Sequence, residues 1–390
     1  MPLRYLTAGE SHGPALTAIL EGMPAGLPLD ESLIAVDLAR RQTGAGSGDR
    51  MAIEKDYAQL LAGVMEGVTT GAPITLQIVN KDHANWKGKA VPAYTTPRPG
   101  HADLVSAVKY GYDDVRPSLE RASARETAVR VAVGAVCRAF LGTFGIRVGG
   151  YVSSLGDVSA RLDGLPFSDR ISRARGSEAQ CPDPDAAAQM AKAIEKAKAA
   201  GETLGGVIEV VATGVPVGLG SHVNWDRRLD ARIGMAILSM NAIKGVEIGD
   251  AFANTRRPGT QAHDAILPGE NGDITRRGNA CGGVEGGISN GQPLWVRAAM
   301  KPIPTTRKGQ DTIDLATGQP SLTYYERSDV CPVPRAVIVL EAIFCHVLAD
   351  ALVEKLGGDS IKEMRQRFDL LRRATLEDLR MTGQPHVFWP

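Results

Sequence analysis

Residues 20–27 of the chain read Leu-Glu-Gly-Met-Pro-Ala-Gly-Leu, and residues 212–219 read Ala-Thr-Gly-Val-Pro-Val-Gly-Leu. Each stretch follows an apolar segment and precedes a segment with helical periodicity and paired basic residues. A long apolar helix is predicted late in each half of the chain. A repeated unit predicts one pseudo-symmetric body of two βαβ-type halves, with a site between them. Chance similarity between two strand–turn–helix units is the alternative.

The remaining pattern predicts strands that alternate with helices. Helical periodicity covers residues 31–41, 119–144, 185–200, 227–243, 334–356 and 360–380. Stretches rich in Val, Ile and Leu between glycines predict strands at residues 14–22, 58–66, 72–79, 146–153, 205–214 and 292–300. Because pairs of strands precede each long helix, we expect an α+β fold with antiparallel sheets and not a doubly wound parallel sheet. We expect a single domain over residues 1–390, with duplicated halves at about 1–204 and 205–390.

The composition is that of an ordinary globular protein. The 390 residues are 43% hydrophobic and 23% charged, and 44 basic residues balance 44 acidic ones. Nucleic-acid and anionic-membrane surfaces require a basic excess, so neither is expected as a partner. The five cysteines form no CxxC pair and no metal-ligand spacing, so no metal is expected. We see no apolar run near the ~18 residues that a membrane span needs, and expect a cytoplasmic protein.

Two histidines lie among small residues. His12 is in the sequence Gly-Glu-Ser-His-Gly (residues 9–13), and His101 is in Arg-Pro-Gly-His-Ala-Asp (residues 98–103). Glycine and alanine neighbours cannot bury an imidazole ring, so room is left for a ligand, and such a histidine can donate or accept a proton. For each ring, the alternative is a structural hydrogen bond to a loop carbonyl. Asp103 is expected either to cap the segment that follows or to orient the ring of His101.

Residues 119–127 predict an anion site. If a helix covers residues 119–144, Arg121 and Arg125 are one turn apart on one face, with a serine and a threonine close by. Arginine, serine and free backbone N–H groups at the start of a helix form a cradle for an anion. The alternative is a solvated charged face on which two neighbouring glutamates compensate the arginines.

Two glycine-rich segments need interpretation. Residues 44–48, Gly-Ala-Gly-Ser-Gly, follow a predicted helix and lack the Gly-Lys-Ser/Thr of a P-loop. Residues 282–291 precede an apolar strand, which favours an ordered wall that a flat or phosphorylated ligand can approach closely. A flexible loop is the alternative for this second segment.

The histidine blocks, residues 121–127 and the later blocks up to residues 327–335 resemble, in order and approximate spacing, the signature stretches of the chorismate synthase family. The resemblance implies a lyase of the shikimate pathway, in aromatic amino acid biosynthesis. Its reaction is the anti-1,4 elimination of phosphate from 5-enolpyruvylshikimate 3-phosphate, which gives chorismate and needs reduced FMN without net redox change. The residues fit this chemistry, since a substrate with two carboxylates and a phosphate requires arginines.

The resemblance also implies roles for single residues. His101 matches the histidine that protonates the reduced flavin, His12 the histidine that assists the departure of phosphate, and Asp329 the aspartate that acts with flavin N5 in removing the C6 proton. Contacts to the flavin are implied for Arg121, Ala122, Ser123, Asn241, Ala242, Gly286, Lys301, Pro302, Ile303, Pro304, Thr305 and Arg327. Contacts to the anionic groups of the substrate are implied for Ser11, Arg41, Arg50, Arg125 and Arg335.

Two positions depart from the family pattern. Where the family has Gly-Tyr-Gly-Arg-Gly, residues 44–48 place Ser47 at the position of the arginine, and Asn241 stands where glutamine is common. Loss of that arginine weakens substrate binding unless Arg50 replaces it. One alternative is therefore a catalytically impaired homologue that binds flavin or anions. Another is a kinase or phosphatase, against which the missing P-loop and metal motifs count.

The family resemblance implies an architecture and partners as well. The fold would be two four-stranded antiparallel sheets around a layer of four helices, assembled as a homotetramer. No nicotinamide fingerprint is seen in the sequence, so an external flavin reductase, and not NADPH bound by this chain, is expected to supply reduced FMN.

Overall fold

The first half of the chain forms a four-stranded sheet. The computed structural model describes residues 2–46, 55–326 and 328–389. Neighbouring strands of this sheet are all antiparallel, in the order β1-β2-β6-β3. Alternate residues of β2 and β6 are buried and apolar, so one face of the sheet is part of the core. The strands are β1 (Arg4–Ala8), β2 (Ala15–Glu21), β3 (Ala58–Ala62) and β6 (Ile74–Val79).

The second half forms a five-stranded antiparallel sheet, in the order β10-β15-β9-β7-β8. Four strands were expected. The fifth, β8, has two residues and folds back on the end of β7 through a turn at Gly156, which has φ of 53°. The strands are β7 (Arg147–Leu155), β8 (Val158–Ser159), β9 (Gly206–Thr213), β10 (Ile243–Ile248) and β15 (Leu294–Met300).

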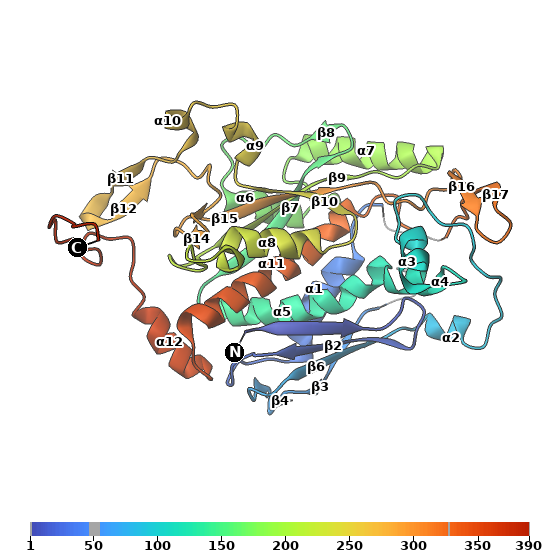
Figure 1. Cartoon of the computed structure of the whole chain (residues 1–390), viewed down its shortest axis with the longest axis horizontal. Helices are drawn as coiled ribbons and strands as arrows, with labels where there is room; N and C mark the ends of the chain where they lie inside the picture. The colour runs from blue at the N-terminus through green and yellow to red at the C-terminus, as the bar shows by residue number, and fades with distance from the viewer. Residues whose placement is uncertain (1, 47–54, 327, 390) are drawn as a thin grey trace.

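Helices lie between the two sheets (Figure 1). They are α1 (Glu31–Gln42), α5 (Thr127–Thr143), α8 (Leu229–Leu238) and α11 (Val333–Leu356). Helix α5 contacts β2 and β6 of the first sheet, whereas α11 contacts β7 and β9 of the second. Helices α5 and α11 pack directly on each other at Gly134, where a Cβ atom would lie 2.2 Å from the Cβ of Ala342. The absence of a side chain at this glycine therefore sets how closely the two helices approach.

The other elements cover the edges and ends of this body. Helices α6 (Phe167–Arg175) and α7 (Pro184–Ala200) lie beside the second sheet, and α12 (Ile361–Asp369) follows α11. Short helices are α2 (His83–Trp86), α3 (Asp103–Tyr110), α4 (Arg116–Arg121), η2 (Ala124–Glu126), η3 (Trp225–Arg227), α9 (Ala251–Asn254), α10 (Gly259–Ala262) and η4 (Glu270–Gly272). Small hairpins pair β4 (Val64–Met65) with β5 (Val68–Thr69), β11 (Ile266–Pro268) with β12 (Ile274–Arg276), β13 (Val284–Glu285) with β14 (Ile288–Ser289), and β16 (Asp311–Asp314) with β17 (Gln319–Leu322).

The predicted helix over residues 119–144 is wrong at its start. Helix α4 ends at Arg121, Ser123 is extended with φ of −64° and ψ of 141°, and α5 begins only at Thr127. The Ser123 side chain accepts a hydrogen bond from the backbone N–H of Arg125 and caps the 3-10 turn η2. Arg121 and Arg125 therefore do not project from one helix face as predicted.

Three other predicted elements end early. The predicted strand over residues 58–66 stops at Ala62, because Gly63 turns the chain with φ of 84°. The predicted helix over residues 227–243 covers only α8 and stops at Leu238, before Ala242 adopts φ of 68°. The predicted helix over residues 360–380 stops at Asp369, after which the backbone of residues 374–376 bonds to the segment around Asp273.

Helix α11 is long and apolar enough to cross a membrane by length and composition alone, which the sequence analysis missed. In its most apolar window, 89% of the residues are buried inside the protein. Its neighbours on opposite sides are α5, α8 and the strands of the second sheet. Such burial is typical of the central helix of a large core.

A buried ion cluster joins the helices between the sheets. The Glu341 carboxylate of α11 is fully buried and accepts two hydrogen bonds from Arg40 of α1, at 2.8 and 3.0 Å, and one from Arg138 of α5, at 2.7 Å. It also accepts a bond from the backbone N–H of Gly150 in β7, at 2.8 Å. Burial alone would raise the pKa of Glu341, but the two arginines hold it below its usual value. The cluster thereby connects elements from both halves of the chain.

Candidate active site

His12 lies in the connection between β1 and β2. Gly9 has φ of 112° there, and a Cβ at this position would lie 2.4 Å from the carbonyl oxygen of Ala15, so only glycine fits. The Nδ1 atom of His12 is 2.6 Å from Oε1 of Glu120 in α4, and the backbone N–H of His12 donates to Oε2 of the same carboxylate at 2.7 Å. The Trp86 ring lies beside the imidazole, with 4.3 Å between centroids. His12 is thus bound to a carboxylate, and not to a loop carbonyl through its ring.

His101 is also bound to a carboxylate. Its Nδ1 atom is 2.5 Å from Oδ1 of Asp103, the first residue of α3. The second oxygen of Asp103 accepts hydrogen bonds from the backbone N–H of Arg98 at 3.0 Å and from its Nε at 2.8 Å. Burial alone would raise the pKa of Asp103, but the hydrogen bonds from His101 and Arg98 hold it well below its usual range. Asp103 therefore orients the ring, one of its two expected roles.

Three of the arginines predicted to bind substrate lie together. Arg41 and Arg125 flank the carboxylate of Asp56, at 3.3 and 2.6 Å, and Nε of Arg335 donates to the carbonyl oxygen of Arg41 at 3.0 Å. Arg335 also donates to the predicted catalytic residue Asp329 at 2.5 Å. Burial and the neighbouring Arg335 lower the pKa of Arg41 to about 9. This concentration of positive charge, only partly neutralised by carboxylates, suits an anionic ligand.

A chain of hydrogen bonds links the arginines to both histidines. On one side, Asn80 donates to the carbonyl oxygens of Glu10 and Gly13, next to His12, and accepts a bond from Nε of Arg125. On this side the hydrogen bonds reach the backbone of the His12 loop and not the imidazole ring of His12. On the other side, Arg98 donates to the Thr305 hydroxyl at 3.2 Å. Ser328, which precedes Asp329, donates to the carbonyl oxygen of Thr305 at 3.1 Å. The His12 and His101 loops thus belong to one polar network.

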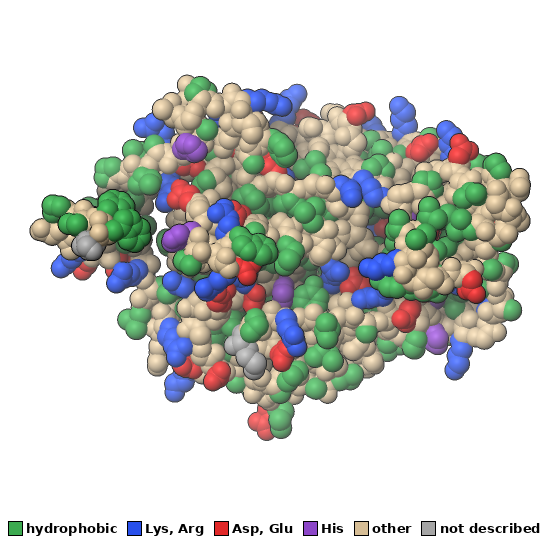
Figure 2. Space-filling model, viewed as in Figure 1, with side chains coloured by type: hydrophobic (Ala, Val, Ile, Leu, Met, Phe, Trp, Pro, Cys, Tyr) green, Lys and Arg blue, Asp and Glu red, His purple; other side chains and the backbone are tan. Residues whose placement is uncertain are grey.

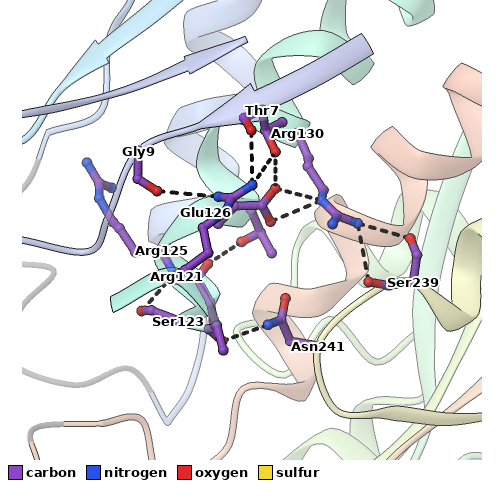
Figure 3. A network of polar contacts seen from close by, with 12 residues as sticks. Thr7, Gly9, Arg121, Ser123, Arg125, Glu126, Arg130, Ser239 and Asn241 are labelled. Atoms are coloured by element: carbon purple, nitrogen blue, oxygen red, sulfur yellow. Dashed lines mark hydrogen bonds and ion pairs between the residues drawn. The ribbon is translucent and has the colours of Figure 1, made fainter. Parts of the chain in front are cut away.

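Several of the residues predicted to bind flavin are neighbours (Figure 3). Asn241 donates to the carbonyl oxygen of Ala122 at 2.8 Å, which joins residues 121–123 to residues 241–242. The backbone N–H of Lys301 donates to the carbonyl oxygen of Ala242 at 3.0 Å, which adds the segment from Lys301 to Thr305. Ser123 contacts the Ser11 hydroxyl at 3.2 Å, so Ser11 is brought to the same place. These segments come from both halves of the chain.

The predicted anion cradle has a different geometry. Arg121 donates to the carbonyl oxygens of Thr7 in β1 and of Gly9 just after it (Figure 3). Arg125 instead donates to Asp56 and Asn80. Arg125 belongs to the buried arginine cluster, and Arg121 anchors the loop that carries His12. The two side chains have different partners because the helix is interrupted between Arg121 and Arg125.

Some predicted site residues are not brought into this network. Gly286 lies in the β13–β14 turn, at the opposite end of the molecule from α3 and α4 (Figure 1), and no hydrogen bond among the described residues joins it to the others. Ser47, Arg50 and Arg327 lie outside the residues that the structure describes.

Sequence reasoning did not assign roles to four residues of the network. These residues are Arg98, Glu120, Asn80 and Asp56. Arg98 lies in the same block as His101 and Asp103, so its position in the sequence was a usable signal. The other three bind residues that are distant in the sequence: Glu120 is 108 residues from His12, Asn80 is 70 from Glu10, and Asp56 is 69 from Arg125. Only the folded chain shows these contacts, because no local pattern marks an isolated asparagine or glutamate as a partner of a distant loop.

One cavity in the described part of the chain lies away from this network. It measures about 380 Å³ and lies between residues 214–217, the β12 strand and the segment 368–375. A much smaller hollow is lined by Thr305, Ser328 and Asp329, next to the polar network. We place the candidate active site at the polar network, because the histidines and the arginine cluster are there and not at the larger cavity.

Comparison with known proteins identifies the family of the chain. The model of the chorismate synthase family matches residues 3–353. The chain belongs to the chorismate synthase family. The chorismate synthase of Geobacter metallireducens is 54% identical over 384 residues, which cover 94% of this chain and 98% of the relative. That of Chlorobaculum tepidum is 48% identical over 389 residues, covering 95% and 98%. A crystal structure of chorismate synthase has a TM-score of 0.78 and 44% identity, and covers 95% of this chain and 97% of that one.

The comparisons confirm the family that the sequence blocks indicated. Chorismate synthases are lyases of aromatic amino acid biosynthesis, so the kinase and phosphatase alternative is set aside. The family match covers both histidine blocks and the arginine cluster, since all of them lie within residues 3–353.

Proposed function

We propose that this chain catalyses the 1,4-elimination of phosphate from 5-enolpyruvylshikimate 3-phosphate, with reduced FMN bound beside the substrate. The observation that carries the proposal is the polar network that unites His12, His101 and Asp329 with three buried arginines. A substrate with three anionic groups needs several cations in one place, and proton transfer needs groups that titrate near neutral pH.

The residues around Lys301 fit a flavin phosphate. The Lys301 ammonium group is half-buried beside Lys244, and burial and this second cation lower the pKa of Lys301. No carboxylate in the described ranges pairs with it, and a Cβ added at Gly100 would lie 3.6 Å from its Nζ. A half-buried lysine that no described carboxylate neutralises, next to the His101 loop, is suited to an anionic cofactor. Residues 121–123, 241–242 and 301–305 would hold the group, with Arg327 and Gly286 added by the family resemblance.

When bound, reduced FMN supplies electron density that helps the phosphate to leave. The residues of the chain do the rest in this proposal. Arg41, Arg125 and Arg335 hold the anionic groups of the substrate. His12 donates a proton toward the departing phosphate, and His101 holds a proton on the flavin side of the site. Asp329 assists removal of the C6 proton, and Arg335 keeps its carboxylate in place.

An anaerobic assay tests this function. The purified protein, FMN reduced with dithionite and 5-enolpyruvylshikimate 3-phosphate are mixed, and phosphate release and chorismate absorbance are followed together. Equimolar appearance of both products is expected, and His12→Ala and His101→Ala should lose most turnover while substrate still binds. Binding of flavin and substrate without product would identify a catalytically impaired homologue, and residues 44–50 would be examined first.

We further infer that the chain is a pseudo-symmetric sandwich. The order β1-β2-β6-β3 in the first sheet corresponds, strand for strand along the chain, to β7-β9-β15-β10 in the second. Helix α1 follows β2 as α8 follows β9. Helix α5 comes after the last strand of the first sheet, and α11 comes after the last strand of the second. Since β7 precedes residue 204 and still belongs to the second sheet, we draw the boundary between the repeats before Arg147. Both repeats contribute to the site, so the whole chain is one catalytic unit in this proposal.

Exposed apolar side chains support the proposed homotetramer. Leu6 and Ile19 are paired across β1 and β2 on the outer face of the first sheet and are 71% and 47% exposed. The C-terminal segment projects from the body with an apolar end (Figure 2), where Phe388 is 78% exposed. Large apolar patches of this kind mark protein interfaces. Light scattering behind gel filtration checks this: a mass of four chains is expected, and a monomer would contradict it.

We propose that reduced FMN comes from an external flavin reductase in the cytoplasm, and that this chain does not reduce FMN with NADPH. An aerobic assay with FMN and NADPH alone tests this. No sustained chorismate formation is expected until a flavin reductase is added, and sustained formation without one would contradict the proposal.

A further inference from the structure

Both predicted catalytic histidines have the same local arrangement. In each, Nδ1 faces a carboxylate oxygen, at 2.6 Å for His12 and Glu120 and at 2.5 Å for His101 and Asp103. The two carboxylates come from different parts of the chain, 108 residues from His12 but only two from His101. The shared geometry therefore does not follow from a shared local motif.

Each carboxylate is itself fixed by a second set of hydrogen bonds. Oε2 of Glu120 accepts the backbone N–H of His12 at 2.7 Å. Oδ2 of Asp103 accepts the backbone N–H and Nε of Arg98, at 3.0 and 2.8 Å. Oε2 of Glu120 is thus held by a backbone donor, and Oδ2 of Asp103 by one backbone and one side-chain donor. The other oxygen of each carboxylate faces the histidine, and at Asp103 it also accepts a hydrogen bond from Nη2 of Arg98 at 3.1 Å.

Both carboxylates are charged at neutral pH. Burial alone would raise the pKa of Glu120, but the hydrogen bonds from the side chain and backbone of His12 lower it, and Asp103 behaves in the same way. An ionised carboxylate can only accept hydrogen bonds, so the Nδ1 atom that faces it carries the proton. The Nε2 atom then remains for proton exchange with a ligand: it accepts a proton when the ring is neutral and donates one when the ring is doubly protonated.

We propose that Glu120 and Asp103 are positioning residues that hold His12 and His101 with the proton on Nδ1, so that Nε2 of each ring exchanges protons in the site. The inference rests on the proposed function for the use of these protons, and on the hydrogen bonds alone for the tautomer. Arg98 holds Asp103 as the backbone N–H of His12 holds Glu120. Its Nη2 donates to Oδ1 of Asp103, the oxygen that Nδ1 of His101 faces, and lies 3.1 Å from that Nδ1 atom.

The geometry predicts what an amide would do in place of each carboxylate. In Glu120→Gln, the amide oxygen is needed by the His12 backbone N–H, so the amide NH2 group faces Nδ1. In Asp103→Asn, the two Arg98 donors hold the oxygen, and the NH2 group again faces the histidine. A donor opposite Nδ1 moves the ring proton to Nε2. Each isosteric variant should therefore reverse the tautomer of its own histidine.

The experiment reads the tautomer directly. Long-range ¹H–¹⁵N correlation spectra of the ligand-free protein distinguish a protonated from an unprotonated ring nitrogen, and His12→Ala and His101→Ala assign the two signals. At a pH high enough for both rings to be neutral, wild type is expected to show protonated Nδ1 and unprotonated Nε2 in both rings. Glu120→Gln should reverse His12 only, and Asp103→Asn should reverse His101 only.

Kinetics provide the second measurement. Each variant should lower kcat by about 100-fold to 10,000-fold, the range for lost orientation of a catalytic histidine, with the KM for substrate changed by about threefold or less. The matched control is Glu126→Gln, a buried glutamate that binds Thr7 and Arg130, with no hydrogen bond to a histidine among the described residues. It should leave both tautomers unchanged and kcat within about threefold of wild type.

The outcomes separate this inference from the proposed function. Wild-type spectra with the proton on Nε2 of either histidine would overturn the inference, even if neither variant folds. Reversed tautomers with unchanged kcat would also overturn it, since the positioning would then have no consequence. If wild type shows the expected tautomers but forms no chorismate, the proposed function fails and the assigned tautomers stand.

Discussion

Lys301 lies beside a second cation, Lys244, near the loop that carries His101. If it binds the phosphate of FMN, Lys301→Met should weaken FMN binding by about 10-fold to 100-fold, because a charge-assisted hydrogen bond is worth ~1.5–3 kcal/mol. Quenching of FMN fluorescence during titration measures this affinity. Lys308→Met is the control, since this lysine is 75% exposed and its loss should leave the affinity unchanged. Equal affinity in wild type and Lys301→Met would remove Lys301 from the cofactor site.

Asn80 connects the His12 loop to the buried arginines. It donates to the carbonyl oxygens of Glu10 and Gly13 and accepts from Arg125, with distances of 2.9 to 3.1 Å. In Asn80→Ala, Arg125 loses one of its anchors, so the KM for substrate should rise about 10-fold, as for other residues that orient a binding group. Steady-state kinetics measure this. The control is Gln59→Ala, which removes an exposed side chain of the neighbouring strand β3 and should leave the KM unchanged. An unaltered KM for Asn80→Ala would mean that Asp56 alone positions Arg125.

The sequence marked the candidate catalytic residues of this site but not their partners. His12, His101 and the arginines stand in blocks whose composition is unusual, so they can be read locally. Glu120 and Asn80 become part of the site only through contacts across 108 and 70 residues. Predicting such contacts requires the register of the first sheet and the end of α4, and neither is encoded in a short pattern.

At the scale of elements, uniform patterns were predicted well and interrupted ones were not. Helix α7 was expected over residues 185–200 and covers Pro184–Ala200, with Asp183 as its cap and Gly201 at its end. Over residues 119–144 the helical pattern is equally strong, yet the chain breaks at Ser123. This break places Arg121 against β1 and Arg125 in the buried cluster, so tertiary contacts override local propensity here.

Gly134 offers a test of the crossing between α5 and α11. A Cβ at this position would lie 2.2 Å from the Cβ of Ala342 and 2.4 Å from its Cα, so Gly134→Ala should lower the free energy of unfolding by about 1–3 kcal/mol through overpacking. Gly142 is in the same helix and has no atom within 4 Å of such a Cβ. Gly142→Ala should therefore leave stability unchanged or raise it by up to ~1 kcal/mol. Urea denaturation of both variants checks the pair, and equal effects would show that α5 and α11 do not cross closely at Gly134.

At the scale of the whole molecule, the two repeats are held together by charge as well as by apolar packing. Glu341 of the second repeat binds Arg40 and Arg138 of the first, and also the backbone of β7. Both halves of the chain contribute to the candidate site, because Asn241 donates a hydrogen bond to the carbonyl oxygen of Ala122. The cluster is therefore in a position to control how the two halves of the site face each other.

Glu341→Gln should lower the free energy of unfolding by about 3–5 kcal/mol, because two arginines would lose the carboxylate that neutralises them. The pKa of Glu341 is below its usual value in the folded protein, so its contribution is fully present above about pH 4.3 and is lost as the pH falls through the lower folded value. The stability gap between wild type and variant, measured by urea denaturation, should therefore narrow below that pH. A gap that stays constant on acidification would contradict a charged Glu341. Because the cluster joins both repeats, fluorescence and circular dichroism should report one shared transition in wild type, and separate transitions for the two halves would show that they fold as independent units.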